Sequence, residues 1–201
     1  MKKWIPVLVA TTACGPKGLV TGDYDVSYGE ALYGSSTLNL YTDSDSNSFS
    51  AEFEETLSAS ECSPVFQEVT TPTKLSLDTT RPTVTDPSAE ESPFAIGNSY
   101  CSYDSYGGKF SSDGVDENVI MCDNDEIIVP VTVDDNGTER SIDVTYTLLW
   151  KFEWKTSLQR VIGFIDISPD NDLNEEDALL VDAAINLECR YLRLMDLELS
   201  E

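Results

Sequence analysis

The stretch IIVPVTVDDNGTERSIDVTYTLLWKFEW, residues 127–154, holds the strongest local structural signal of the chain. Residues 127–133 and 142–154 are rich in β-branched and aromatic side chains, which favour strands. Between these two runs stands Asn136-Gly137, a pair that favours a type I′ turn because both residues tolerate a positive φ. Along the second run every second residue is apolar, and polar side chains dominate the positions between. The stretch therefore predicts a hairpin whose second strand buries one face.

Further strands are predicted on both sides of this hairpin. Residues 160–167 form a third strand after a short polar turn at 156–159, so three sequential strands suggest a meander. Upstream, apolar residues alternate with polar ones around a Ser- and Asp-rich turn within residues 38–53, which predicts a second hairpin. The predicted fold class is therefore mainly β, either a β-sandwich or a curled antiparallel sheet, with one C-terminal helix.

The length and composition of the chain suit one hydrophobic core. Its 201 residues are 40% hydrophobic and 9% aromatic, so we expect a single β-rich domain at residues 19–201. Within this domain, residues 70–93 contain four prolines and seven threonines but few large apolar side chains. Such a composition favours extended, non-helical chain, and we expect a long exposed loop there.

The helix is expected directly after Pro169. Asn174 can cap its first turn, where three acidic residues are favoured by the helix dipole. Ala178, Val181, Ile185 and Cys189 would then share one face, and a disulfide from the last of them would pin the helix to the sheet. Residues 191–199 could continue this helix or turn back as an edge strand.

The charge of the chain is strongly negative. Asp and Glu number 37 against 12 Lys and Arg, which gives a formal net charge of −25. Such a surface repels nucleic acid and anionic lipid, whereas it attracts cations and basic partners. It also suits solubility in a saline medium, where self-repulsion is screened. We therefore expect no nucleic-acid partner.

The N-terminus has the pattern of an export signal. Lys2 and Lys3 are followed by a short, mostly apolar run and then by small residues directly before Cys14. The run is too short to cross a membrane of about 30 Å as a helix. The segment resembles a bacterial lipoprotein signal, which implies cleavage of residues 1–13, a lipid on Cys14 and a tether at 14–18. The alternative is an uncleaved apolar N-terminus.

The other four cysteines are Cys62, Cys101, Cys122 and Cys189, an even number that suits two disulfides in an oxidising compartment. We favour Cys101 with Cys122, since each borders a turn-rich stretch, and hence Cys62 with Cys189, although three pairings are possible. A zinc site is the competing use of four cysteines, but the chain has neither a C-x-x-C pair nor a histidine. Structural disulfides are therefore the preferred interpretation.

One acidic segment resembles a calcium-binding loop. Residues 166–177 place oxygen side chains at alternating positions ahead of the predicted helix, as in EF-hands and dockerin-type repeats. The resemblance implies calcium as a cofactor. Its ligands would be the side chains of Asp166, Ser168, Asp170, Asn174 and Asp177, together with the backbone carbonyl oxygen of Asp172. The alternative is a polar connection between a strand and a helix that ends in an Asn cap.

A second candidate segment spans residues 98–110. Tyr100, Tyr103 and Tyr106 alternate there with Ser, Asp and Gly, a composition that makes adaptable contact surfaces in binding loops. The same residues also make ordinary turns, so a disulfide-closed surface loop without a ligand is the alternative.

The motifs favour binding over catalysis. Without histidine, the Ser-His and Cys-His nucleophile pairs are excluded, and no phosphate-cradling glycine loop is present. We therefore expect a lipid-anchored structural or binding module of the bacterial cell envelope, at the outer membrane or cell surface, with an envelope protein or glycan as partner. The alternative is a hydrolase that uses a pair of carboxylates on envelope or extracellular polysaccharide.

Overall fold

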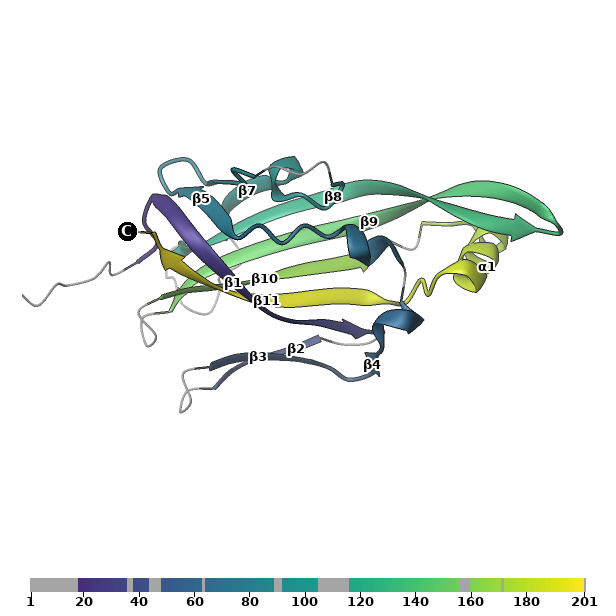
Figure 1. The fold of residues 1–201 in the computed structure, drawn as a ribbon, viewed down its shortest axis with the longest axis horizontal. Coiled ribbons are helices and arrows are strands. Elements are labelled where there is room, and N and C mark those ends of the chain that lie inside the picture. Colours follow the sequence, from purple (N-terminus) through teal and green to yellow (C-terminus); the bar gives the residue numbers. More distant parts are fainter. Residues whose placement is uncertain are drawn as a thin grey trace, which may run out of the picture.

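The computed structural model describes residues 18–35, 38–43, 48–62, 64–88, 92–104, 116–155, 160–170 and 172–200. Its main feature is one antiparallel sheet that curls on itself (Figure 1). The strands are, in spatial order, β6 (Thr83–Thr85), β5 (Lys74–Asp78), β1 (Gly22–Gly34), β11 (Arg190–Leu199), β10 (Arg160–Pro169), β9 (Thr138–Lys155), β8 (Asp116–Asp135) and β7 (Tyr100–Asp104). The short strand β4 (Thr56–Leu57) also pairs with β1.

The two edges of this sheet meet, so the sheet is nearly closed. Strands β6 and β7 lie in contact, and the Tyr103 hydroxyl donates to the Thr79 carbonyl oxygen in the turn between β5 and β6. Strands β5 to β11 therefore follow one another around the curl in sequence order, and β1 fills the place between β11 and β5. The predicted fold class is confirmed, in its curled-sheet form.

The hairpin predicted from residues 127–154 is the longest element of the fold. Strands β8 and β9 pair along their length, and Asn136 and Gly137 have φ values of 54° and 86° at the turn. Strand β10 pairs next to β9, which confirms the meander. The apolar face of β9 points into the curl, where Tyr146, Leu148 and Trp150 are fully buried.

Residues 70–93 are not the exposed loop that their composition predicts. They contain β5 and β6, which pair with each other, and β5 also pairs with β1. Leu75, Leu77 and Val84 are buried in the core of the curl. The alternation of apolar and polar residues along β5 decides the structure here, although proline and threonine dominate the segment.

The C-terminal helix α1 (Glu175–Ala184) lies beside the distal part of the β8–β9 hairpin (Figure 1). Asn174 caps it as predicted, since its Oδ1 accepts from the Asp177 amide at 3.0 Å. The helix ends before Cys189, which lies in the turn that leads into β11, so the disulfide does not pin the helix as we expected. Residues 191–199 are a strand.

A smaller hairpin covers part of the outer face of the sheet. It consists of β2 (Leu38–Asp43) and β3 (Ser48–Phe53), in agreement with the prediction for residues 38–53. Phe53 is 3% exposed and packs with Phe164 and Leu192, which point away from the interior of the curl. The hairpin therefore adds a partial second layer outside the sheet.

We expect Gly34→Ala to loosen this hairpin. A Cβ at Gly34 would lie 2.2 Å from Cγ of Phe53 and 2.7 Å from the Glu55 carbonyl oxygen, so Phe53 would have to leave its place. Overpacking of this kind costs about 2 kcal/mol of unfolding free energy.

Urea denaturation would measure this loss. Gly29→Ala on the same strand is the matched control, since a Cβ there meets nothing closer than 3.8 Å. Equal stability of the two variants would show that Phe53 does not hold the hairpin in place.

Candidate functional site

A groove lies between the segment that leads into β5 and the segment that follows β6. Its volume is about 520 Å³, within the range of roughly 300–1,000 Å³ that is usual for small-molecule sites. Ser and Thr hydroxyl groups make up half of its lining, and we call it the hydroxyl groove. The lining residues are Gln67, Glu68, Val69, Thr70, Thr71, Pro72, Thr73, Asp86, Ser88 and Ser92.

Aromatic packing fixes both walls of the hydroxyl groove. One wall follows the 3-10 helix η2 (Pro64–Glu68), whose Phe66 has its ring centroid 6.0 Å from that of Tyr146. The other wall leads to Phe94, whose ring lies 5.9 Å from the same tyrosine. Both contacts are T-shaped, a favourable arrangement of aromatic rings. The groove is therefore built over a buried aromatic cluster.

Hydrogen bonds also hold the walls. The Tyr28 hydroxyl donates to the Pro72 carbonyl oxygen at 2.9 Å, and the Val26 amide donates to the Thr73 carbonyl oxygen at 2.9 Å. At the other end, the Ser92 hydroxyl donates to the Glu68 carbonyl oxygen and so links the two walls. Such fixed walls lower the entropic cost of ordering the site when a ligand binds.

Tyr28 stands beneath the wall that contains Pro72. Burial raises the pKa of its phenol well above the ordinary value. The positive charge of Arg193 lowers this pKa in part, and the negative charge of Asp86 raises it further. The Arg193 guanidinium lies 5.2 Å from the Tyr28 ring centroid, and its Nε donates to the Gly29 carbonyl oxygen at 2.9 Å.

We expect the unfolding free energy to fall as the pH rises above about 10, where tyrosine ionises in the unfolded chain. Burial raises the pKa of Tyr24, Tyr28 and Tyr191, so the folded state keeps protons that the unfolded chain releases. Phenolate absorbance should then show late-ionising tyrosines whose titration coincides with unfolding. If all nine tyrosines ionise in one step near pH 10 without unfolding, the prediction is wrong.

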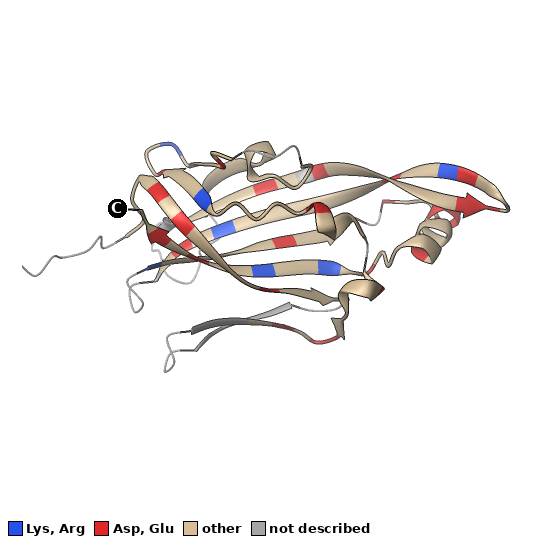
Figure 2. Ribbon diagram, viewed as in Figure 1, with Lys and Arg blue, Asp and Glu red and all other residues tan. Residues whose placement is uncertain are grey.

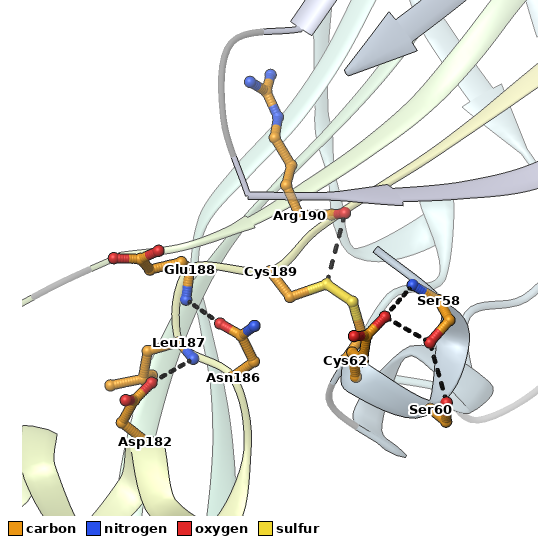
Figure 3. The surroundings of a disulfide bond; sticks show 10 residues. Ser58, Ser60, Cys62, Asp182, Asn186, Leu187, Glu188, Cys189 and Arg190 are labelled. Atoms are coloured by element: carbon orange, nitrogen blue, oxygen red, sulfur yellow. Dashed lines mark hydrogen bonds between the residues drawn. A yellow bond between two sulfur atoms is a disulfide. The ribbon is translucent and has the colours of Figure 1, made fainter. Parts of the chain in front are cut away.

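The two disulfides have the pairing that we favoured. Cys62 bonds to Cys189 across a sequence separation of 127, and Cys101 bonds to Cys122 across 21. The first joins the turn between η1 (Ala59–Glu61) and η2 to the start of β11 (Figure 3). The second links directly opposed residues of β7 and β8. Cys14, the predicted lipidation site, lies outside the described residues.

The predicted calcium ligands are not gathered into one loop. Asp166 lies inside β10 and is 6% exposed, and its carboxylate accepts two hydrogen bonds from the Arg190 guanidinium. Asp177 pairs with Arg140 at 2.7 Å and with the capping Asn174.

The remaining predicted calcium ligands lie at and after the end of β10. Ser168 lies at the end of β10, whereas Asp170 and Asp172 follow that strand. Among the described residues, no group of three or more acidic, Cys or His side chains is placed to hold a metal ion. Calcium binding stays a prediction.

The tyrosines of the second candidate segment do not share one surface. Tyr100 and Tyr103 both lie on β7, a strand rather than the predicted loop. Tyr100 is 83% exposed, whereas Tyr103 packs against the core of the curl. Tyr106 lies outside the described residues. A binding role for this segment stays untested.

Sequence reasoning did not single out the hydroxyl groove. One wall, residues 67–73, leads into β5, and the other, with Asp86, Ser88 and Ser92, follows β6, so the pairing of these two strands brings the walls together. The one signal in the sequence was the density of threonines, which we interpreted as a loop.

Acidic side chains are spread over the surface, including the tip of the β8–β9 hairpin and α1 (Figure 2). The hydroxyl groove carries Glu68 and Asp86, and its lining includes neither lysine nor arginine. The groove therefore disfavours anionic ligands. In the part of the chain that the structure describes, no helix is long and apolar enough to span a membrane.

Comparisons of the whole chain found no matching family model, no similar curated protein and no similar solved structure.

Proposed function

We propose that this chain is a binding module of the bacterial cell envelope, exported and attached to a membrane by a lipid on Cys14. The observation that carries the proposal is the pair of disulfides, because such bonds form and persist in oxidising compartments outside the cytoplasm. The N-terminal pattern supports export and lipid attachment in this proposal. It consists of a positive charge, an apolar run, small residues and a cysteine.

The hydroxyl groove supplies the binding function in this proposal. Its volume is about 520 Å³, and its walls are held by hydrogen bonds and by buried aromatic rings. A groove of this size with convergent polar groups is the usual place for a ligand. A partner in the envelope would supply the ligand.

The hydrolase alternative has less support. A general acid for glycoside hydrolysis needs a carboxyl group with a raised pKa. Hydrogen bonds from Ser58 lower the pKa of Glu61, and hydrogen bonds from Thr80 lower that of Asp78, so neither of these two groups suits the role of the general acid. We therefore propose binding and leave catalysis as the alternative.

Intact mass spectrometry of the protein from its native host tests the export and attachment. We expect a chain that lacks residues 1–13, is heavier by a lipid and is lighter by four hydrogens, one pair for each disulfide. A chain that begins at Met1 and has free thiols would contradict the proposal.

Sedimentation with isolated envelopes tests the binding role. We expect the chain with Cys14→Ser to co-sediment with envelopes of the producing cells even though it has no lipid. Asp86→Asn should reduce this association, because Asp86 lines the hydroxyl groove. Glu139→Gln at the exposed hairpin tip removes the same charge elsewhere and is the matched control. Equal binding by both variants would show that the groove is not the binding site.

A further inference from the structure

We infer that the hydroxyl groove binds an oligosaccharide that carries free amino groups. The inference rests on the proposed function only in taking this groove as the binding site. It adds the chemical class of the ligand, which follows from the hydrogen-bonding groups and the charge of the walls.

The hydroxyl groups of the groove indicate a polyhydroxylated ligand. Five side chains of the lining are Ser or Thr. The hydroxyl groups of Thr70, Thr71 and Thr73 can each donate one hydrogen bond and accept others. The Ser88 and Ser92 hydroxyl groups already donate within the protein and can still accept. Gln67 adds an amide that both donates and accepts. Sugar hydroxyl groups have the same double character, so they can pair with such a wall in many places. An apolar ligand would leave these groups without partners, at a cost in binding free energy.

The two carboxylates indicate that the ligand also carries positive charge. Glu68 and Asp86 stand on opposite walls, and an ionised carboxylate can only accept hydrogen bonds. An ammonium group donates three and completes a charge-assisted pair, which is stronger than a neutral one. The formal net charge of −25 adds a general attraction for cations. Acidic polysaccharides are disfavoured for the same reason.

Asp86 is also oriented by its own neighbour. Its Oδ1 accepts from the Ser88 amide at 2.8 Å and from the Ser88 hydroxyl at 2.6 Å. These two bonds fix one oxygen of the carboxylate and leave the other for a ligand. Asparagine can keep the Oδ1 bonds while it removes the charge, so Asp86→Asn changes the recognition chemistry and preserves the turn.

Isothermal titration calorimetry with the full chain tests this inference with three probes. These are the trimer of glucosamine, the trimer of N-acetylglucosamine and spermidine, all at physiological salt. We expect the glucosamine trimer to bind more tightly than its acetylated form, which lacks the positive charges, and more tightly than spermidine, which lacks the hydroxyl groups. Asp86→Asn should weaken the binding of the glucosamine trimer about tenfold, the usual effect of losing a hydrogen bond to a charged group.

Glu139→Gln is again the control, since it removes one negative charge from an exposed position at the hairpin tip. If Asp86→Asn and Glu139→Gln weaken binding of the glucosamine trimer equally, or if spermidine binds as tightly as this trimer, the affinity comes from general charge attraction. Either result would overturn the inference. If no probe binds but envelope association still depends on Asp86, the hydroxyl groove is the binding site and its ligand is not an amino-oligosaccharide, which overturns the inference. If envelope association is also independent of Asp86, the site is wrong as well.

Discussion

Replacing both Cys62 and Cys189 by alanine is expected to lower the unfolding free energy by about 5 kcal/mol, on the chain-entropy account of disulfides. This bond closes a sequence separation of 127, so the unfolded chain gains much freedom when the bond is lost. Domains of ordinary stability have about 5–15 kcal/mol in total, so the variant should be close to unfolding at physiological temperature.

The second disulfide provides a comparison within the same chain. Cys101 and Cys122 close a separation of only 21, and the same account gives about 3 kcal/mol for their replacement by alanine. Thermal unfolding should therefore show a larger fall in Tm for the first double variant, by roughly 10–20 °C against roughly 6–12 °C for a chain of this length. Equal losses, or a larger loss for the second pair, would contradict the entropic account.

The position of the Cys62–Cys189 bond adds a local consequence. Cys62 lies between η1 and η2, and η2 carries Phe66, which packs against Tyr146 beneath the hydroxyl groove. Loss of the bond should therefore loosen one wall of the groove before the sheet itself unfolds. Hydrogen exchange should then rise first in residues 64–73, and ligand binding should weaken under conditions where the sheet is still intact.

The elements that the sequence predicted well are those stabilised by neighbours along the chain. The β8–β9 hairpin follows from one Asn-Gly turn and from strict alternation along β9, and both signals lie within residues 127–154. The capped start of α1 depends on Asn174 and the turn after it. Such local signals need no knowledge of the rest of the fold.

The features that were missed depend on pairing between distant segments. Strand β1 lies between β11 and β5, so its place in the sheet depends on the last strand of the chain. The walls of the hydroxyl groove flank β5 and β6, but their support comes from Tyr146 of the distant strand β9, against which Phe66 and Phe94 pack. Composition also misled us at residues 74–78, where a strand pattern stands within a stretch rich in proline and threonine.

The interpretation of Asp166 shows the same limit in one residue. Residues 166–177 do have the spacing of oxygen side chains that a calcium loop needs. That spacing does not reveal that Asp166, the first carboxylate, lies within a strand. Its partner Arg190 lies 24 residues away, at the start of the neighbouring strand. Arg190 lies outside the twelve residues of the loop motif, so the motif alone could not predict this ion pair.

We expect Asp166→Ala to lower the unfolding free energy by about 3 kcal/mol, the lower end of the usual range for breaking a buried ion pair. Asp166 is 6% exposed, and the Arg190 Nε donates to its Oδ1 at 2.7 Å. Without the carboxylate, a half-buried guanidinium loses its charge partner. We take the lower end because the Arg190 side chain is 31% exposed and water screens part of its charge.

Two further variants separate the ion pair from the predicted calcium loop. Asp170→Asn removes an exposed carboxylate that the calcium prediction counts as a ligand, and on the ion-pair account it should change stability by less than about 0.5 kcal/mol. The double replacement Asp166→Leu with Arg190→Met removes both charges together, and it should recover most of the stability lost in Asp166→Ala.

Urea denaturation with calcium and with a chelator distinguishes the two accounts. If Asp166 acts through Arg190, the loss in Asp166→Ala is the same in both media, because the ion pair needs no metal. If calcium stabilises the chain and both Asp166→Ala and Asp170→Asn abolish that gain, residues 166–177 bind the metal, and the Asp166 carboxylate must exchange Arg190 for calcium. The size of the gain in the unaltered chain would then give the calcium affinity of the folded state, since a ligand that binds only the folded form stabilises it by mass action.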